Sequence, residues 1–299
     1  MQKIKSLLKL AWWLAVIVYI AIFLSGNIGS VGLIAQQLSI IQISTALLSI
    51  LTGKILLTFI MQQSLSHHKV DFSFIKCFHV YNITQLGKYI PGSIWQFVGR
   101  VGLYKEAGIA NLTIRDSILL ETFWVLASAG LMGFILTLIS GRQMLQELNG
   151  YLPDYSVLIL MLSLALGYVV TISTSWGRRL QSYLLRLRFT PMSAISSAFV
   201  WILLGISFWV TLLPFASDQV TLTYIIGLFA LSYAIGFVVP FAPAGLGIRE
   251  AILVIGLLHT LDKETSIVLA SLNRVFYIFI EILLASLATA LNKKPLRQT

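Results

Sequence analysis

Long apolar runs separated by short polar segments repeat along the whole chain. Six runs approach or exceed the roughly 20 residues that a helix needs to cross the hydrocarbon core of a bilayer. They are Leu10–Ile28, Ile40–Met61, Ile114–Ile139, Tyr155–Trp176, Met192–Leu213 and Ser266–Leu291. No polar block between them is long enough to fold separately. The pattern therefore predicts an all-α integral membrane protein in which residues 1–299 form a single polytopic membrane domain.

Proline and glycine interrupt two further apolar segments. Phe78–Gly108 breaks at Pro91-Gly92, and the apolar pieces on either side are too short to span alone. Leu222–Val239 and Ile248–Leu258 flank a second break. Because lipid cannot satisfy freed backbone groups, irregular backbone at membrane depth is expected only inside protein or along a cavity. We therefore expect two re-entrant helical hairpins, although Leu222–Val239 is also long enough to span by itself.

The order span, hairpin, span occurs twice, over about residues 40–140 and 192–291. The two hairpins start from opposite sides of the membrane. In each half an arginine follows the break and an acid lies in the next span: Arg100 and Glu121, then Arg249 and Glu281. Inverted repeats with interrupted helices near the midplane are a recurring transporter architecture. The sequence therefore predicts an inverted-repeat arrangement.

The composition agrees with a membrane protein, because 58% of the residues are hydrophobic and only 11% are charged. Soluble proteins average roughly 25% charged residues. The net charge of +10 could suggest a nucleic-acid partner, but the basic residues cluster beside the apolar spans. This is the positive-inside pattern, which places both termini in the cytoplasm of a multi-pass cell-membrane protein and attracts anionic lipids. The clusters are Lys3–Lys9, Lys69–Lys76, Arg178–Arg188 and Lys293–Arg297.

The sequence carries no sign of metal or cofactor chemistry. The single cysteine, Cys77, excludes an internal disulfide and a cysteine-based metal cluster. The four histidines are scattered, and no phosphate-binding P-loop, HExxH pair or nucleophile elbow is present. We therefore expect no metal, no cofactor and no catalytic residue, and hence not an enzyme.

The candidate binding residues gather at the two breaks. A helix N-terminus attracts anions, and glycine lets a ligand approach the backbone closely. Arg249 falls in the first turn of its half-helix, and we expect Ser93 to cap the returning half of the first hairpin. The candidate substrate-binding residues are Lys88, Pro91, Gly92, Arg100, Glu121, Gly245, Gly247, Arg249, Glu250, Arg274 and Glu281. Such a cationic pocket suits an anionic lipid headgroup or a lipid-linked phosphate.

A structural role is the alternative for the same charges. Glu250 can satisfy its helix dipole, and Arg274 and Glu281 lie seven residues apart on one face of the last span. Lys54 lies about 12 Å from the inner end of its span at 1.5 Å per residue, so we expect it to face the bundle interior. Ion pairs among these residues would lock the bundle. An unpaired charge at this depth costs roughly 2.5–3.5 kcal/mol on insertion scales. The ligand site and the ion-pair lock both remain open at this point.

Two segments resemble the signature segments of the lysylphosphatidylglycerol synthase transmembrane-region family: Leu86–Gln96 with Gly99-Arg100, and Pro243–Glu250. That family includes the flippase-like half of the bacterial multiple peptide resistance factor. The resemblance covers nearly the whole chain. It implies a lipid-handling membrane domain of a family in which flippase activity is attributed to some members. Multiple peptide resistance factors carry a soluble aminoacyl-transferase domain after the membrane part. Because this chain stops at Thr299, we expect the synthase activity to be absent.

These features favour a lipid flippase or transporter that binds an anionic phospholipid or a polyprenyl-linked lipid. One alternative is a membrane enzyme that modifies a lipid phosphate, with Glu250 or Glu281 as the base. The other is a non-catalytic partner that presents a lipid to a biosynthetic enzyme such as a glycosyltransferase.

Overall fold

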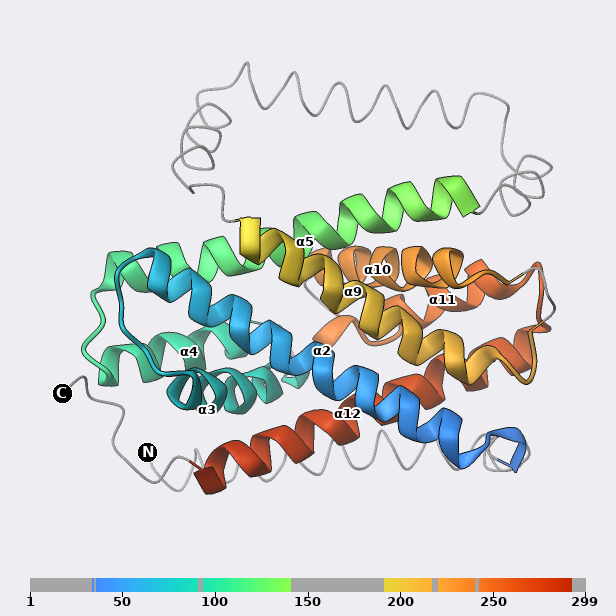
Figure 1. Cartoon of the computed structure of the whole chain (residues 1–299), viewed down its shortest axis with the longest axis horizontal. Coiled ribbons are helices and arrows are strands. Elements are labelled where there is room, and N and C mark those ends of the chain that lie inside the picture. The colour runs from blue at the N-terminus through green and yellow to red at the C-terminus, as the bar shows by residue number, and fades with distance from the viewer. Residues whose placement is uncertain are drawn as a thin grey trace, which may run out of the picture.

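The computed structural model describes residues 34, 36–90, 94–140, 191–216, 220–239 and 242–291. Helices dominate these residues, and no strand occurs among them. The helices are α2 (Ile40–His67), α3 (Phe74–Gln85), α4 (Trp95–Glu106), α5 (Asn111–Ser140), α9 (Pro191–Leu212), α10 (Leu222–Val238), α11 (Ile248–Leu257) and α12 (Lys263–Leu291), with short 3-10 turns η1 (Leu86–Tyr89) and η2 (Pro243–Gly245) (Figure 1). The predicted all-α fold is confirmed for this part of the chain.

Four of the described helices, α2, α5, α9 and α12, are long and apolar enough to cross a membrane. They coincide with four of the six predicted spans. The other two, Leu10–Ile28 and Tyr155–Trp176, lie outside the described residues. The helix α10 is strongly apolar but has only 17 residues. The described helices therefore have the length and composition of a membrane-embedded bundle.

Side-chain caps fix where several helices begin. At the start of α2, Ser39 and Gln42 form a capping box. The side chain of each residue accepts a hydrogen bond from the backbone N–H of the other. Thr221 accepts a hydrogen bond from the backbone N–H of Tyr224 at the start of α10. Before α12, the Asp262 carboxylate accepts a hydrogen bond from the backbone N–H of Thr265 at 2.9 Å. This hydrogen bond lowers the pKa of the exposed Asp262 carboxyl below its ordinary value.

Each interrupted segment contains two helices that pack on each other, and we refer to these helix pairs as the first and the second hairpin. The helix α3 packs against α4, and α10 packs against α11. In Figure 1 the pair α3 and α4 lies toward the left and the pair α10 and α11 toward the right. Their connecting turns, η1 and η2, contact each other. The turn that follows α3 and the turn that precedes α11 therefore lie next to each other.

Most helix pairings in the first half have a counterpart in the second. The contact of α3 with α12 corresponds to that of α10 with α5, and the contact of α2 with α3 to that of α9 with α10. The helices α2 and α9 pack directly on each other and run in opposite directions, as Figure 1 shows. The helices α5 and α12 also run in opposite directions in this view. Corresponding elements of the two halves thus occupy corresponding surroundings.

Small residues allow α10 to approach its neighbours at backbone distance. A Cβ atom at Gly133 of α5 would lie 2.6 Å from the Leu231 nitrogen of α10. A Cβ atom at Gly205 of α9 would lie 2.6 Å from the Cα atom of Ile226, which also belongs to α10. Small residues at helix interfaces are the usual means of close packing in membranes, where the hydrophobic effect drives no association between helices.

This packing predicts opposite effects for two alanine substitutions on α5. Gly133→Ala places its methyl group against backbone that cannot move aside, and overpacking of this kind costs about 1–3 kcal/mol. Gly130→Ala has no neighbour within 4 Å of the new Cβ atom, and replacing glycine by alanine inside a helix stabilises by about 0.5–1 kcal/mol. We expect the melting temperature in detergent to fall for Gly133→Ala and to rise or stay constant for Gly130→Ala. Equal shifts for both variants would contradict this packing.

Candidate anion-binding site

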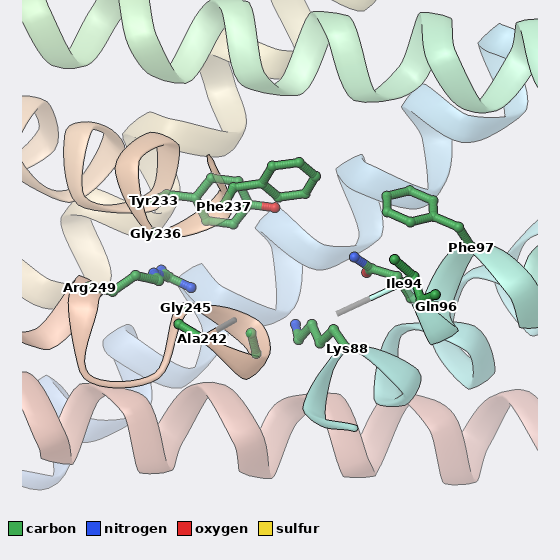
Figure 2. Close-up of a pocket in the computed structure, with 11 residues that line it drawn as sticks. Lys88, Ile94, Gln96, Phe97, Tyr233, Gly236, Phe237, Ala242, Gly245 and Arg249 are labelled. Atoms are coloured by element: carbon green, nitrogen blue, oxygen red, sulfur yellow. The ribbon is translucent and has the colours of Figure 1, made fainter. Parts of the chain in front are cut away.

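A cavity of about 200 Å³ lies where the two hairpins meet (Figure 2). The first hairpin contributes residues from η1 and from the start of α4, and the second contributes residues from α10, η2 and α11. The lining residues are Lys88, Ile94, Gln96, Phe97, Tyr233, Gly236, Phe237, Ala242, Ala244, Gly245 and Arg249. Lys88 and Arg249 are the charged residues in this lining, and Figure 2 shows them extending toward each other from opposite sides.

Arg249 is buried in the first turn of α11, with a relative exposure of 6%. Its guanidinium carbon lies 4.9 Å from the ring centre of Tyr233, 5.4 Å from that of Tyr277 and 5.5 Å from that of Phe229. Within the described ranges no carboxylate forms an ion pair with it, and its buried Nε atom has no hydrogen-bond partner. The structure therefore leaves one buried cation surrounded by aromatic rings and without a counter-charge.

Two glycines make room for this guanidinium. Any Cβ atom at Gly236 of α10 would clash with the Arg249 side chain, and one at Gly245 would lie 3.0 Å from its Cδ atom. Gly245 also has a φ of +70°, in the left-handed region that favours glycine. These two positions therefore serve the placement of the arginine as well as the shape of the cavity.

Glu281 of α12 joins three elements through one buried carboxylate. Lys54 of α2 and Lys88 of η1 both form ion pairs with its Oε1 atom. The Tyr89 hydroxyl donates to its Oε2 atom at 2.8 Å. Lys54 also lies 3.9 Å from the ring centre of Tyr277. The prediction that Lys54 faces the bundle interior is confirmed, since this residue is 2% exposed.

Arg274 of α12 holds the tip of the second hairpin. Its Nη2 atom donates to the Ala244 carbonyl oxygen at 2.9 Å, and its Nε atom lies 3.6 Å from Glu250 Oε1. The other Glu250 oxygen accepts from the Gly247 N–H at 2.7 Å. The prediction that Glu250 satisfies the start of its own helix is therefore confirmed. Gly247, with a φ of +83°, is exposed and serves the turn rather than the cavity wall.

Arg100 and Glu121 form a separate buried ion pair. One Arg100 nitrogen, Nη1, lies 2.8 Å from Glu121 Oε1 and 2.7 Å from Oε2, and the guanidinium stacks on the Tyr81 ring. Both residues line a smaller neighbouring cavity of about 30 Å³. Four residues line both cavities and so form the wall between them: Gln96, Phe97, Tyr233 and Phe237. The Arg100 pair thus has the form of a structural lock.

The structure brings together only part of the predicted site. Lys88, Gly245 and Arg249 line the larger cavity. Glu281 contacts the lining residue Lys88, Arg274 contacts the lining residue Ala244, and Glu250 contacts Arg274. Arg100 and Glu121 face the smaller cavity, and Pro91 and Gly92 lie outside the described residues. The predicted cap residue Ser93 also lies outside the described residues, and Ile94, the residue directly before α4, makes no side-chain cap hydrogen bond.

Sequence reasoning missed the aromatic part of the site. Tyr233 and Phe237 lie on α10, an almost uniformly apolar helix in which nothing distinguishes a cavity residue from a packing residue. The partner of Lys54 was also missed, because Glu281 lies 227 residues away in the chain. Across the residues that the structure describes, no group of three His, Cys, Asp or Glu side chains could hold a metal ion.

No protein-family model and no curated protein matched this chain. The resemblance to the lysylphosphatidylglycerol synthase transmembrane-region family therefore stays a prediction, and the function has to be argued from the chemistry of the site.

The Glu281 cluster predicts a large loss of stability when this carboxylate is removed. Glu281→Ala leaves Lys54 and Lys88 buried without their counter-charge, and breaking a buried pair in this way costs about 3–5 kcal/mol. Glu264→Ala, at the exposed start of the same helix, removes only a dipole interaction of about 0.3–1 kcal/mol. Thermal unfolding of the two variants in the same detergent measures the difference. Equal melting temperatures would show that Glu281 does not hold the bundle together.

Proposed function

We propose that this protein is a lipid transporter of the flippase type, which binds the phosphate group of an anionic lipid between its two helical hairpins. The observation that carries the proposal is Arg249, a buried cation without a counter-charge that lines a cavity together with Lys88. A buried charge is stable only when it is paired, so a site of this kind is completed by an anion.

In this proposal α2, α5, α9 and α12 cross the bilayer, and the two hairpins reach its middle from opposite sides. The matching helix pairings and the opposed directions of α2 and α9 support an inverted repeat. Transporters of this class bind their substrates where interrupted helices meet near the midplane. Rocking of one repeat against the other would then expose the site alternately to each leaflet.

The distribution of charge supports a location in the cell membrane. The end of the bundle where α2 stops and α3 starts carries Lys69, Lys76, Lys105 and Arg115. The opposite end, where α12 starts, carries Asp262, Lys263 and Glu264. By the positive-inside rule the basic end faces the cytoplasm. We propose that both chain termini lie on that side as well.

The rim of the cavity suits a lipid tail. Ile94 lines the cavity and is 58% exposed, and its neighbours Trp95 and Val98 are also exposed apolar residues. A cavity of about 200 Å³ accommodates a phosphate group but not two acyl chains. The headgroup would therefore sit inside while the hydrocarbon tail stays in the lipid.

The alternative of a lipid-modifying enzyme has no support in the site. Glu281 is bound by two lysines and a tyrosine, and Glu250 is bound by Gly247 and Arg274. Neither carboxylate is among the residues that line the cavity. Both acids therefore hold the structure in place instead of facing a substrate as a base.

If the protein transports lipid, substitution of Arg249 is expected to reduce the rate of lipid exchange between the two leaflets. In proteoliposomes with lipids labelled in one leaflet, we expect the wild-type protein to speed exchange between leaflets and Arg249→Gln to slow it at least about tenfold. Truncating a charge that pairs with a buried partner costs about 2–5 kcal/mol. The matched control is Arg115→Gln, since Arg115 is 54% exposed and pairs with Asp116 away from the cavity.

Size-exclusion and thermal unfolding have to show that each variant is folded. Folded wild-type protein that leaves exchange unchanged for a broad panel of anionic lipids would contradict the transport proposal. Lipid binding without exchange would instead favour a partner that presents lipid to a biosynthetic enzyme.

A further inference from the structure

Among the residues that the structure describes, the buried and half-buried charges around the cavity do not balance. Each side chain in its ordinary ionised form contributes one charge, and four cations face two carboxylates, which leaves a surplus of two positive charges. The cations are Lys54, Lys88, Arg249 and Arg274, and the carboxylates are Glu250 and Glu281. The Arg100–Glu121 pair next to the cavity is neutral in itself.

The remaining described carboxylates are too peripheral to supply the missing charge. Asp71, Glu106, Asp262 and Glu264 lie in loops or at helix ends, and Asp116 pairs with Arg115 near the start of α5. The surplus therefore belongs to the cavity region of the described structure.

Pairing places this surplus on the two residues that line the cavity. Lys54 alone suffices to neutralise Glu281, and Arg274 neutralises Glu250. What remains are Lys88 and Arg249, one from each hairpin, which Figure 2 shows extending toward each other. An anion that draws Lys88 away from Glu281 would leave that carboxylate paired with Lys54. The ligand therefore meets two positive charges without creating a new unpaired acid.

The surroundings of these two cations favour a compact group with several acceptor oxygens. Arg249 is held between aromatic rings, so its planar guanidinium is oriented before a ligand arrives. Guanidinium groups match the geometry of phosphate oxygens with paired hydrogen bonds, and a lysine acts as a compact point charge beside them.

We infer that this cavity takes a doubly charged phosphate monoester in preference to a singly charged phosphodiester, an inference that rests on the proposed function and narrows its substrate class. A phosphate monoester carries a charge of about −1.5 to −2 at pH 7, with a second pKa of about 6. It neutralises both Lys88 and Arg249, whereas a phosphodiester leaves one of them without a counter-charge. Lipids of the first kind are phosphatidic acid and polyprenyl phosphates, and phosphatidylglycerol is of the second kind.

Two lipids with identical acyl chains test the preference. We expect the purified full chain to bind phosphatidic acid at least about tenfold more tightly than phosphatidylglycerol at pH 7.5, measured by titration in detergent micelles. The ratio is expected to shrink at about pH 5, where the monoester loses its second charge. The charged and titratable groups of the cavity lining are Lys88, Arg249 and the hydroxyl of Tyr233. Those that surround this lining are Lys54, Arg274, Glu250, Glu281 and the hydroxyls of Tyr89 and Tyr277. Phosphatidylglycerol, measured at both pH values, controls for titration of these groups.

Charge variants test the mechanism. Arg249→Gln removes one of the two surplus charges, so the ratio between the two lipids is expected to fall to within about threefold. Arg249→Lys keeps the charge and is expected to retain the preference, even where it weakens both affinities. Arg115→Gln is expected to leave both affinities and their ratio unchanged.

The outcomes separate this inference from the proposed function. Equal affinities for the two lipids, both weakened by Arg249→Gln, would overturn the preference for a dianion and leave the proposed function standing. Folded protein that binds neither lipid would overturn both. Inorganic phosphate serves as the probe for a free anion: binding as tight as that of phosphatidic acid would support the dianion but overturn a lipid as its source.

Discussion

The buried carboxylate of Glu281 is the constraint on which the arrangement of this bundle depends. It receives Lys54 from α2 and Lys88 and Tyr89 from η1, so it fixes the tip of the first hairpin against α12. Arg274, on the same helix, fixes the tip of the second hairpin through the Ala244 carbonyl. The separation of seven positions between Arg274 and Glu281 corresponds to two turns and about 10 Å of helix. The helix α12 is therefore the frame that holds both tips at a set separation, and the cavity lies where they meet.

The two halves of the chain use corresponding arginines in different ways. Arg100 lies in the second turn of α4 and Arg249 in the first turn of α11, and both are buried against aromatic rings. Arg100 forms an ion pair with Glu121 of the following long helix, α5. In the second half the following long helix is α12, and its acid, Glu281, pairs with Lys54 and Lys88 instead of with Arg249. One arginine is thus neutralised within the protein and the other is not. This difference turns a repeated architecture into a bundle with one cationic cavity beside one ion-pair lock.

The sequence predicted those parts of the structure that local patterns encode. The length of an apolar run and the position of proline and glycine located α2, α5, α9, α12 and both helix breaks, because these signals act within a few turns of helix. The boundaries differ where a helix continues past its apolar run into polar residues, as α2 does to His67. The partners of the buried charges could not be predicted, since Lys54 and Glu281 meet only when α2 packs against α12. For the same reason the sequence left the ion-pair lock and the ligand site both open. The structure shows Arg100 in an ion pair and Arg249 in the lining of a cavity.

The donor that an anion would meet in this cavity is a side chain rather than a helix end. The N–H of Gly247, at the start of α11, is already bonded to Glu250, so that amide is not free for a ligand. Arg249 instead offers a guanidinium that three aromatic rings hold in place without neutralising it. A cation–π contact can contribute about 2 kcal/mol when it is desolvated, and it leaves the edge of the guanidinium available for hydrogen bonds. A carboxylate in the same place would have stabilised the bundle further and closed the site. Aromatic rings without a paired carboxylate are therefore the physical feature that distinguishes the proposed binding site at Arg249 from the Arg100–Glu121 lock.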